Sequence, residues 1–281
     1  MPKCDVCHNK CNLGDGDTGL CRARKYEDGS FKCANYGHIT SIALDPIEKK
    51  PLNLFYPGSN IISVGSYGCN LRCPFCQNHE ISYGFGKEYE MDYRYISPKE
   101  LAMIAKDYED SGNIGVAFTY NEPLIGYEYV IDTAKEVHEL GMKTVLVSNG
   151  NVGKRVRDLV IPHIDAMNID LKGFTDKYYS EVLGGNRQMV MDFIEEAAKT
   201  SHVEVTTLIV PGVNDSDEEI NELSLWISSL NCGKGREEIA LHISRYFPRF
   251  KMNLPATDVN RIYELKEVAG KNLKYVFTGN C

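Results

Sequence analysis

The stretch Cys69-Asn-Leu-Arg-Cys73-Pro-Phe-Cys76 places three cysteines in C-x3-C-x2-C spacing, with an aromatic residue directly before the third. A four-iron cluster held entirely by protein takes four cysteine thiolates. Three thiolates on one tight loop therefore indicate a cluster with one iron left open for a ligand. A zinc loop and a chance group of buried thiols are the alternatives, but zinc sites usually pair their cysteines in two short knuckles.

Outward from this loop, the chain from Asn60 onward alternates short β-branched runs with amphipathic stretches, a pattern typical of βαβ units. Roughly six such units predict an α/β fold in which a parallel sheet curls into a partial (β/α)6 TIM-like barrel. In such barrels the chemistry lies at the carboxyl ends of the strands. The expected strands are 61–66, 114–119, 143–148, 166–171, 203–210, 239–244 and 273–278.

The segments between these strands have the signals of helices. Ser97-Pro98-Lys99-Glu100 combines an N-cap, a proline at the first helical position and a capping-box glutamate. Apolar residues then repeat at helical spacing until Gly112, and the same pattern runs from Tyr127 to Gly141. Further helices are expected at 152–162, 188–200, 216–230 and 257–270.

Composition narrows the class of protein. The 281 residues carry a net charge of −8, and no basic run suggests a phosphate-binding surface, which disfavours nucleic acid as the main partner. No apolar run reaches the roughly 18 residues of a membrane span, and the N-terminus lacks the apolar segment of a signal peptide. We therefore expect a cytoplasmic protein without a membrane partner. In that compartment ten cysteines favour metal ligation over disulfides.

Polar motifs follow almost every expected strand. They are Tyr67-Gly68, Thr119-Tyr-Asn-Glu-Pro123, Ser148-Asn-Gly150, Asp170-Leu-Lys172, Pro211-Gly-Val-Asn-Asp215, and His242 with Arg245. Because the carboxyl ends of parallel strands meet at one end of a barrel, these motifs predict a single pocket lined by several strand tips.

With these motifs in place, the chain resembles the radical S-adenosylmethionine (SAM) superfamily, in the branch of pyruvate formate-lyase activating enzymes. Within that branch it most resembles the radical SAM enzymes of the AmmeMemoRadiSam system group. The resemblance covers nearly the whole chain from about Cys4. It rests on Asp45-Pro-Ile-Glu-Lys-Lys-Pro-Leu52, Gly68-Cys-Asn-Leu-Arg-Cys-Pro-Phe-Cys-Gln-Asn78, Thr119-Tyr-Asn-Glu-Pro123, Asn168-Ile-Asp-Leu-Lys-Gly173 and His242-Ile-Ser-Arg-Tyr-Phe-Pro248.

The resemblance implies a [4Fe–4S] cluster and SAM as cofactors, with Cys69, Cys73 and Cys76 as iron ligands. It implies reductive cleavage of SAM to methionine and a 5′-deoxyadenosyl radical, which abstracts hydrogen from a substrate. A flavodoxin or ferredoxin would donate the electron. The first candidate substrate is a backbone glycine of a partner enzyme, and the second is another macromolecule or a small molecule. A non-catalytic iron–sulfur or zinc scaffold is the rival from a different class.

The resemblance also assigns residues to SAM. Phe75 would shield the cluster near the adenine, unless it is an ordinary core aromatic. Asn121 and Glu122 replace part of the superfamily's Gly-Gly-Glu-Pro segment and would accept from the methionine ammonium. The Tyr-Asn that stands in place of Gly-Gly adds bulk there. Ser148 and Asn149 would approach the SAM carboxylate or ribose.

Three further residues have competing interpretations. Asp170 and Lys172 lie two apart on a strand and so face the same way, either toward SAM or as an internal ion pair. One acidic position of a cation site found in activating enzymes corresponds to Val147, which argues against such a cation. His242 would contact adenine or substrate, although a lone strand histidine is more often a buried residue with internal partners.

A cysteine-rich N-terminal extension, 1–58, is expected before the radical SAM barrel, 59–281. Its first 35 residues are rich in Gly and Asp and have neither helical nor strand periodicity. Four cysteines in a segment that cannot build its own core suggest a metal. Zinc is the first choice, an auxiliary iron–sulfur cluster the second and unligated thiols the third, with His8 as a substitute ligand. The four cysteines are Cys4, Cys7, Cys11 and Cys21; Cys33, Cys232 and Cys281 are expected to be plain thiols.

Overall fold

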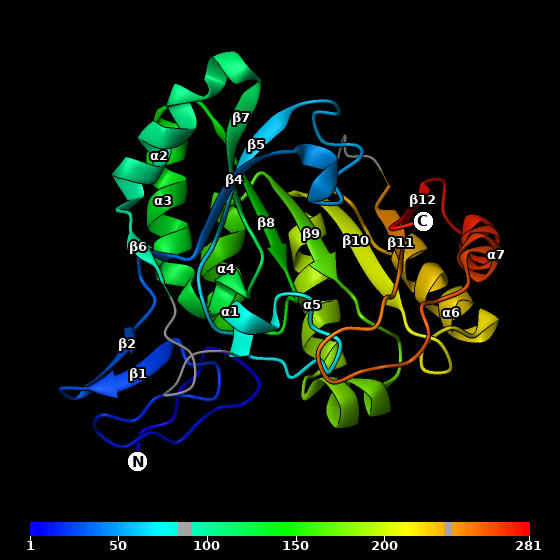
Figure 1. The fold of residues 1–281 in the computed structure, drawn as a ribbon, viewed down its shortest axis with the longest axis horizontal. Coiled ribbons are helices and arrows are strands. Elements are labelled where there is room, and N and C mark those ends of the chain that lie inside the picture. Colours follow the sequence, from blue (N-terminus) through cyan, green and yellow to red (C-terminus); the bar gives the residue numbers. More distant parts are fainter. Residues whose placement is uncertain (84–91, 234–237) are drawn as a thin grey trace.

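The computed structural model describes residues 1–83, 92–233 and 238–281, and its centre is an eight-stranded sheet (Figure 1). The order is β12-β11-β10-β9-β8-β7-β5-β4, so seven strands follow one another across the sheet in chain order. These seven pair in parallel, which confirms the expected α/β fold. The strands are β4 (Ser41–Pro46), β5 (Asn60–Gly65), β7 (Asn113–Phe118), β8 (Lys143–Ser148), β9 (Ala166–Asp170), β10 (His202–Ile209), β11 (Ala240–Arg245) and β12 (Val276–Gly279).

Helices line one side of the curved sheet, behind it and to its left and right in Figure 1. The first of the large helices begins as predicted, because the Ser97 hydroxyl accepts a hydrogen bond from Glu100 N at 3.2 Å and Pro98 is its first residue. These helices are α2 (Pro98–Asp107), α3 (Tyr127–Glu139), α4 (Lys154–Val160), α5 (Arg187–Ala198), α6 (Asp217–Ser228) and α7 (Val259–Gly270).

Short elements join this framework. The 3-10 helices are Ile47–Lys49, Glu109–Ser111, Pro123–Gly126 and Ile161–His163, and Tyr178–Leu183 forms a π-helix. Helix α1 (His79–Tyr83) follows the cysteine loop, and β3 (His38–Ile39) pairs with β6 (Arg94–Tyr95).

The hydrophobic core lies between the sheet and the helices. Leu146 of β8 and Val205 of β10 are fully buried in one cluster with Phe193 of α5 and Leu265 of α7. Burying each such side chain contributes roughly 1.5–3 kcal/mol, so the sheet and its helices form a rigid frame for the strand ends. In the described ranges, no helix combines the length and apolar character needed to cross a membrane.

The N-terminal region differs from expectation at two places. A hairpin of β1 (Arg24–Glu27) and β2 (Ser30–Cys33) stands where no periodicity was found. Its turn, Asp28-Gly29, has positive φ at both residues, the conformation of tight hairpin turns. The second difference is β4, which pairs antiparallel with β5 and so adds a strand from the expected extension to the sheet. The boundary at residue 58 stays a prediction.

Candidate functional site

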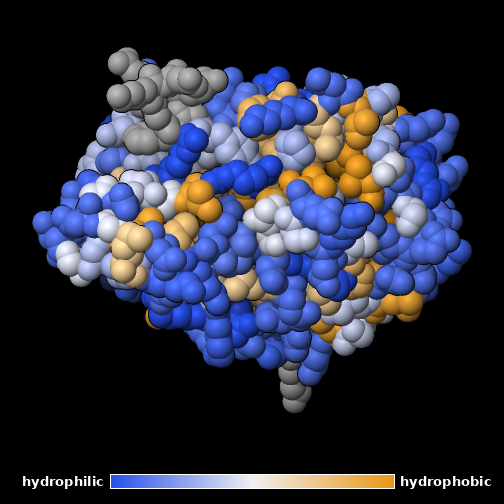
Figure 2. Space-filling view, turned by 90° about the horizontal axis from the view of Figure 1, so that it is seen from below, coloured by the Kyte–Doolittle hydropathy of each residue, from blue (hydrophilic) through white to orange (hydrophobic). Residues whose placement is uncertain are grey.

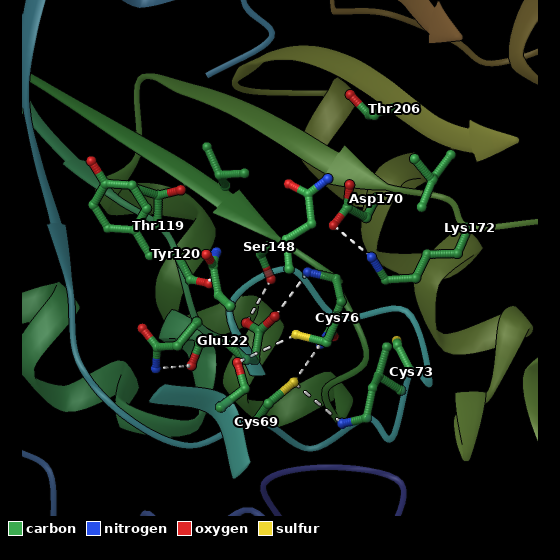
Figure 3. Close-up of a pocket in the computed structure, with 18 of the residues that line it drawn as sticks. Cys69, Cys73, Cys76, Thr119, Tyr120, Glu122, Ser148, Asp170, Lys172 and Thr206 are labelled. Carbon is green, nitrogen blue, oxygen red and sulfur yellow. Dashed lines mark hydrogen bonds and ion pairs between the residues drawn. The ribbon is translucent and has the colours of Figure 1, made fainter. Parts of the chain in front are cut away.

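A cavity of about 340 Å³ opens at the carboxyl ends of the parallel strands. The cysteine loop forms one side of it, and residues from the ends of β7, β8, β9 and β10 form the others (Figure 3). Most of the strand-end motifs therefore contribute residues to one pocket, as predicted. The predicted residues that line it are Cys69, Cys73, Phe75, Cys76, Asn121, Glu122, Ser148, Asn149, Asp170 and Lys172.

The cysteine loop leaves β5 through a turn that only glycine fits. Gly68 has φ +88°, and a Cβ there would lie 2.3 Å from the Cys21 carbonyl oxygen. The thiols that follow are buried or half-buried and line the pocket. Burial, with the nearby Glu122 carboxylate, raises the pKa of Cys69 well above its ordinary value, and burial raises that of Cys73 to about 11. Three thiols gathered on one loop at a cavity fit the donor set of a [4Fe–4S] cluster with one open iron.

Glu122 is the buried acid of the site, with 1% of its surface exposed. Its carboxylate accepts from the Ser148 hydroxyl at 2.7 Å, Asn149 N at 2.8 Å and Leu124 N at 2.9 Å. Burial raises the pKa of Glu122 to about 7, although these donors act to lower it. The residue is thus held in one position beside the cysteine loop, where a cationic ligand would stabilise its ionised form.

Two asparagines connect the strand ends to the cysteine loop. The Asn121 amide donates to Gly68 O at 3.1 Å and accepts from Ser66 N at 2.9 Å. The Asn149 amide donates to Asn70 Oδ1 at 2.9 Å, and its Nδ2 lies 3.7 Å from Cys69 Sγ. Both side chains therefore position the loop, and their contact with SAM stays a prediction.

Asp170 and Lys172 lie side by side on the pocket wall opposite Glu122, with their charged groups directed toward each other (Figure 3). The Lys172 ammonium lies 2.8 Å from Asp170 Oδ2. Burial acts to lower the pKa of Lys172, but the Asp170 carboxylate together with the nearby Cys73 and Tyr179 outweighs it, and the pKa is raised well above its ordinary value. The pair is internal and at the same time lines the pocket, so both interpretations of the sequence describe part of the geometry.

His242 lies apart from the residues that line the pocket. Its Nε2 is 2.6 Å from Glu204 Oε2, and His202 reaches the other oxygen of that carboxylate at 3.0 Å. Burial alone would raise the pKa of the fully buried Glu204, but the hydrogen bonds from His202 and His242 lower it to about 2. The predicted contact of His242 with adenine or substrate is therefore not supported; its ring is held in a buried network beneath the pocket.

Tyr120, expected at the pocket, has partners next to β4 that the sequence did not indicate, and one of them, Lys50, also lines the pocket. Tyr120 has a left-handed backbone, φ +71°, and its hydroxyl donates to Asp45 Oδ2 at 2.8 Å. The buried Lys50 ammonium pairs with the same oxygen at 2.8 Å and lies 4.8 Å from the centre of the Tyr120 ring. A Cβ at Gly65 would lie 2.9 Å from that ring, so Gly65 makes room for it. The segment that begins at Asp45 was part of the resemblance, but nothing in its spacing indicated a pocket.

A curved sheet of parallel strands with three cysteines on the loop after its first parallel strand defines a class of cluster-binding barrel. The family model of the radical SAM superfamily matches residues 63–224 of the chain. The chain belongs to the radical SAM superfamily. Members of this superfamily use a [4Fe–4S] cluster and SAM, and the chain is accordingly a radical SAM enzyme.

Relatives of the chain include an uncharacterized protein and, at lower identity, activating enzymes. It is 37% identical over 281 residues to the uncharacterized protein MJ0808 of Methanocaldococcus jannaschii, covering 99% of this chain and 81% of the other. It is 27% identical over 188 residues to a pyruvate formate-lyase-activating enzyme of Clostridium pasteurianum, covering 66% and 77%. Among solved structures, a radical SAM methyltransferase from Sphaerobacter thermophilus superposes with a TM-score of 0.59 at 16% identity, covering 80% of this chain and 67% of the other, and shares the fold.

Proposed function

We propose that this chain generates a radical from SAM and uses it to abstract hydrogen from a protein substrate, in the manner of the glycyl-radical activating enzymes. The observation that supports this most directly is the position of Glu122, a buried carboxylate in the same pocket as the three cysteine thiols. A carboxylate accepts a strong hydrogen bond from an ammonium group, which SAM carries on its methionine end.

In this proposal each pocket residue has one task. Cys69, Cys73 and Cys76 would hold three irons as thiolates, and Glu122 would accept from the SAM ammonium. When bound, the reduced cluster supplies the electron that cleaves SAM to methionine and a 5′-deoxyadenosyl radical. Phe75 is buried at the pocket wall, where it excludes water from the cluster side.

The remaining polar residues orient SAM. The Ser148 hydroxyl holds one oxygen of Glu122 and so sets the direction of the other. Asn149 N donates to that second oxygen, which keeps a further lone pair for the ammonium, whereas the first oxygen already accepts from both Ser148 and Leu124 N. The Asp170–Lys172 pair on the opposite wall offers one charge of each sign to the SAM carboxylate and ribose.

A protein substrate is supported by the names of the relatives. Besides the Clostridium pasteurianum enzyme, a chain named as a putative glycyl-radical enzyme activating enzyme, MJ1632, is 24% identical over 230 residues. In the described residues β12 and β4 are the edge strands of the sheet, and we propose that a peptide loop reaches the strand tips from between these edges. Reduction by a flavodoxin- or ferredoxin-type carrier belongs to the same proposal. A small molecule or another macromolecule is the second candidate substrate.

The test of radical chemistry is anaerobic reconstitution with iron and sulfide, followed by dithionite and SAM. We expect 5′-deoxyadenosine and methionine, measured by chromatography. Cys73→Ala should lose the cluster and the product, whereas Cys33→Ala should keep both because Cys33 lies in the β1–β2 hairpin. Equal cluster content in the two variants would contradict the ligand assignment, and no product from a fully loaded cluster would favour an inert scaffold.

The test of the protein substrate adds a candidate glycyl-radical enzyme to the reduced, SAM-loaded protein. A glycyl radical signal by electron paramagnetic resonance is the expected result. Product formation from SAM without any such signal, over a panel of candidate enzymes, would move the search to small molecules.

We also propose a zinc site at the N-terminal cysteines. Cys4, Cys7 and Cys21 are buried, and a Cβ at Gly19 would lie 3.7 Å from Cys11 Sγ and 3.8 Å from Cys21 Sγ, so these two thiols share a small space. Over the described ranges, no three His, Cys, Asp or Glu side chains are already arranged to hold one metal ion. Zinc binding therefore requires the thiols to close around the ion, as structural zinc sites do when they order a segment.

Elemental analysis of the protein before iron reconstitution tests this site. We expect one zinc per chain, lost in Cys7→Ser and kept in the matched control Cys281→Ser, whose thiol is exposed. Extra iron and sulfide after reconstitution, dependent on the same cysteine, would replace zinc with an auxiliary cluster. No metal in either preparation would leave the thiols unligated.

A further inference from the structure

The outer side of the cysteine loop is covered by the loop that connects β11 to α7. Lys251 N donates to Pro74 O at 2.9 Å and so joins the two loops directly. Phe250 next to it has a left-handed backbone, φ 58°, which is unfavourable for a bulky residue. Its ring stacks on His79 at 4.6 Å and on Tyr83 at 5.3 Å between centres. The strained backbone therefore serves to place an aromatic ring against α1.

Cations lie over these stacked rings. The Arg72 guanidinium is 5.7 Å from the centre of the Tyr83 ring, and the Lys251 ammonium is 5.1 Å from that of Phe250. Arg72 and Lys251 are exposed, and so is Arg249 beside them. We name this surface the cationic aromatic layer; its members are Arg72, His79, Tyr83, Arg249, Phe250 and Lys251.

The inner side of this layer touches the proposed cluster ligands. The Tyr83 hydroxyl donates to Cys73 O at 3.4 Å. Tyr83 also lines the same pocket as Cys69, Cys73 and Cys76. A molecule bound to the outside would be separated from the thiols by a single layer of rings and one stretch of backbone.

The charge of the layer contrasts with that of the chain. The whole protein carries −8, whereas three of the six members of the layer are permanently cationic. Glu80 of α1 is an exposed acid beside them. On the face seen from below, hydrophilic side chains surround a band of hydrophobic ones (Figure 2); on the same scale all members of the layer except Phe250 are hydrophilic. Aromatic residues and arginine at a charged rim are the composition of protein interfaces, and electron-transfer encounters need only small ones.

We propose that the cationic aromatic layer is the docking surface for an acidic one-electron carrier protein of the flavodoxin type. This rests on the proposed radical SAM function. In each encounter the reduced carrier loses one electron and the cluster gains it, with no atom transferred. Cations at the rim attract the acidic carrier and set its orientation, while the half-buried stacked rings lie between it and the cysteine loop.

The experiment compares two reductants on the same reconstituted protein with SAM. One is dithionite, a small molecule that needs no docking surface, and the other is a bacterial flavodoxin kept reduced by NADPH and its reductase. We expect Arg249→Glu with Lys251→Glu to lower flavodoxin-driven 5′-deoxyadenosine formation at least tenfold at low salt, within the range of electrostatic steering. Dithionite-driven formation should stay within about twofold of wild type.

Three controls make the result decisive. Lys135→Glu, a reversal on the exposed side of α3, should change neither rate. The milder Arg249→Gln with Lys251→Gln should show the same selective loss, and rising salt should slow the flavodoxin-driven rate of the wild type alone. An unchanged flavodoxin-driven rate, or equal losses with both reductants at full cluster content, would overturn the docking surface. Absence of product with dithionite in the wild type would instead overturn the proposed function.

Discussion

Two neighbouring rows of inward-pointing side chains on β9, β10 and β11 differ in how many of their polar atoms have hydrogen-bond partners within the protein. Because side chains alternate along a strand, residues two apart share a face. The row at the strand tips, Asp170 of β9, Thr206 of β10 and Ser244 of β11, lines the pocket. The row below it consists of Asn168 and Glu204, which are in register, and of His242, whose ring reaches Glu204 although its backbone is in register with Thr206.

The lower row finds its partners within the protein. Glu204 accepts from two histidines and from Leu54 N at 2.8 Å and Asn53 N at 3.1 Å. Asn168 donates to Pro51 O at 2.8 Å. The segment after the first 3-10 helix thus packs against this polar row, and the Glu204 carboxylate finds four donors within the protein.

The upper row has fewer internal partners and opens to the cavity. Thr206 donates to Asn168 Oδ1 at 2.9 Å, and Asp170 pairs with Lys172, which leaves oxygen lone pairs directed into the pocket. A polar residue inside a barrel is therefore not by itself a sign of a site. What indicates a ligand site is a polar residue whose hydrogen-bonding capacity is not already taken up by the surrounding backbone and side chains.

Removing the central acceptor of the lower row should have the largest effect on stability. Glu204→Gln replaces a buried, fully paired carboxylate by an amide that cannot accept from every present donor. We expect the free energy of unfolding to fall by about 3 kcal/mol, measured by denaturant titration, with dithionite-driven SAM cleavage retained at 25 °C. Glu218→Gln on the exposed side of α6 should change it by less than about 0.5 kcal/mol. Lost SAM cleavage in a folded Glu204→Gln protein would make the lower row part of the site.

The corresponding change at the pocket should affect function and spare stability. Glu122→Gln keeps the shape of the side chain but weakens its bond to the SAM ammonium. We expect SAM cleavage to fall about a hundredfold, as for removal of one key electrostatic contact in an active site. The melting temperature should shift little, since the pKa of about 7 means that the fold already accommodates a neutral group. A variant that cleaves SAM at the wild-type rate would remove Glu122 from the SAM contacts; Glu139→Gln on α3 is the control.

The two acids should also respond to pH in opposite directions. The folded pKa of Glu122 is about 7, above the ordinary 4.5, so its contribution to stability is complete below about 4.5 and lost as pH rises to about 7. The folded pKa of Glu204 is about 2, so its contribution is complete above about 4.5 and lost as pH falls toward 2. SAM needs the ionised Glu122, and we expect its dissociation constant to fall about tenfold between pH 6 and 8, measured by calorimetry. A flat profile in the wild type, equal to that of Glu122→Gln, would contradict this.

The smallest effect on stability and activity is expected from loss of the hydrogen bond that joins the upper row to the lower row, from Thr206 to Asn168. Thr206→Val removes the hydroxyl that donates to Asn168 and keeps the side-chain volume. We expect a loss of about 1 kcal/mol in unfolding free energy and a SAM cleavage rate within about twofold of wild type. A drop in cleavage of tenfold or more, at unchanged cluster content, would show that Thr206 belongs functionally to the pocket.

Much of this frame was predictable from local sequence. The seven parallel strands lie within three residues of their expected bounds, because each is a β-branched run between turn residues. Helix α2 was predictable from Ser97 and Pro98, since its capping depends on neighbours in the chain. The cysteine loop was predictable because its three cysteines lie within eight consecutive positions of the sequence.

The partners of buried polar groups were not predictable in this way. His242 meets Glu204 across 38 residues, and Tyr120 meets Asp45 across 75, so no local spacing contains either contact. Strand β4 is an edge strand of the sheet that pairs with β5, and half of its side chains are exposed. It therefore lacks the hydrophobic run by which the buried parallel strands were predicted. The β1–β2 hairpin has one local signal, its Asp28-Gly29 turn, but the residues on either side lack the alternating pattern of strands, so the hairpin was not predicted.

The contacts of the first residues also bear on the order of assembly. Gly153 N donates to Val6 O at 2.9 Å, Asn9 donates to Asn70 O at 2.9 Å, and His8 reaches Gly184 O. These residues leave the ribosome long before their partners do, and their last contact waits until residue 184 has been made. The N-terminal segment therefore docks late, at the entropic cost of closing a long loop. Until then the N-terminal segment leaves its side of the cysteine loop uncovered.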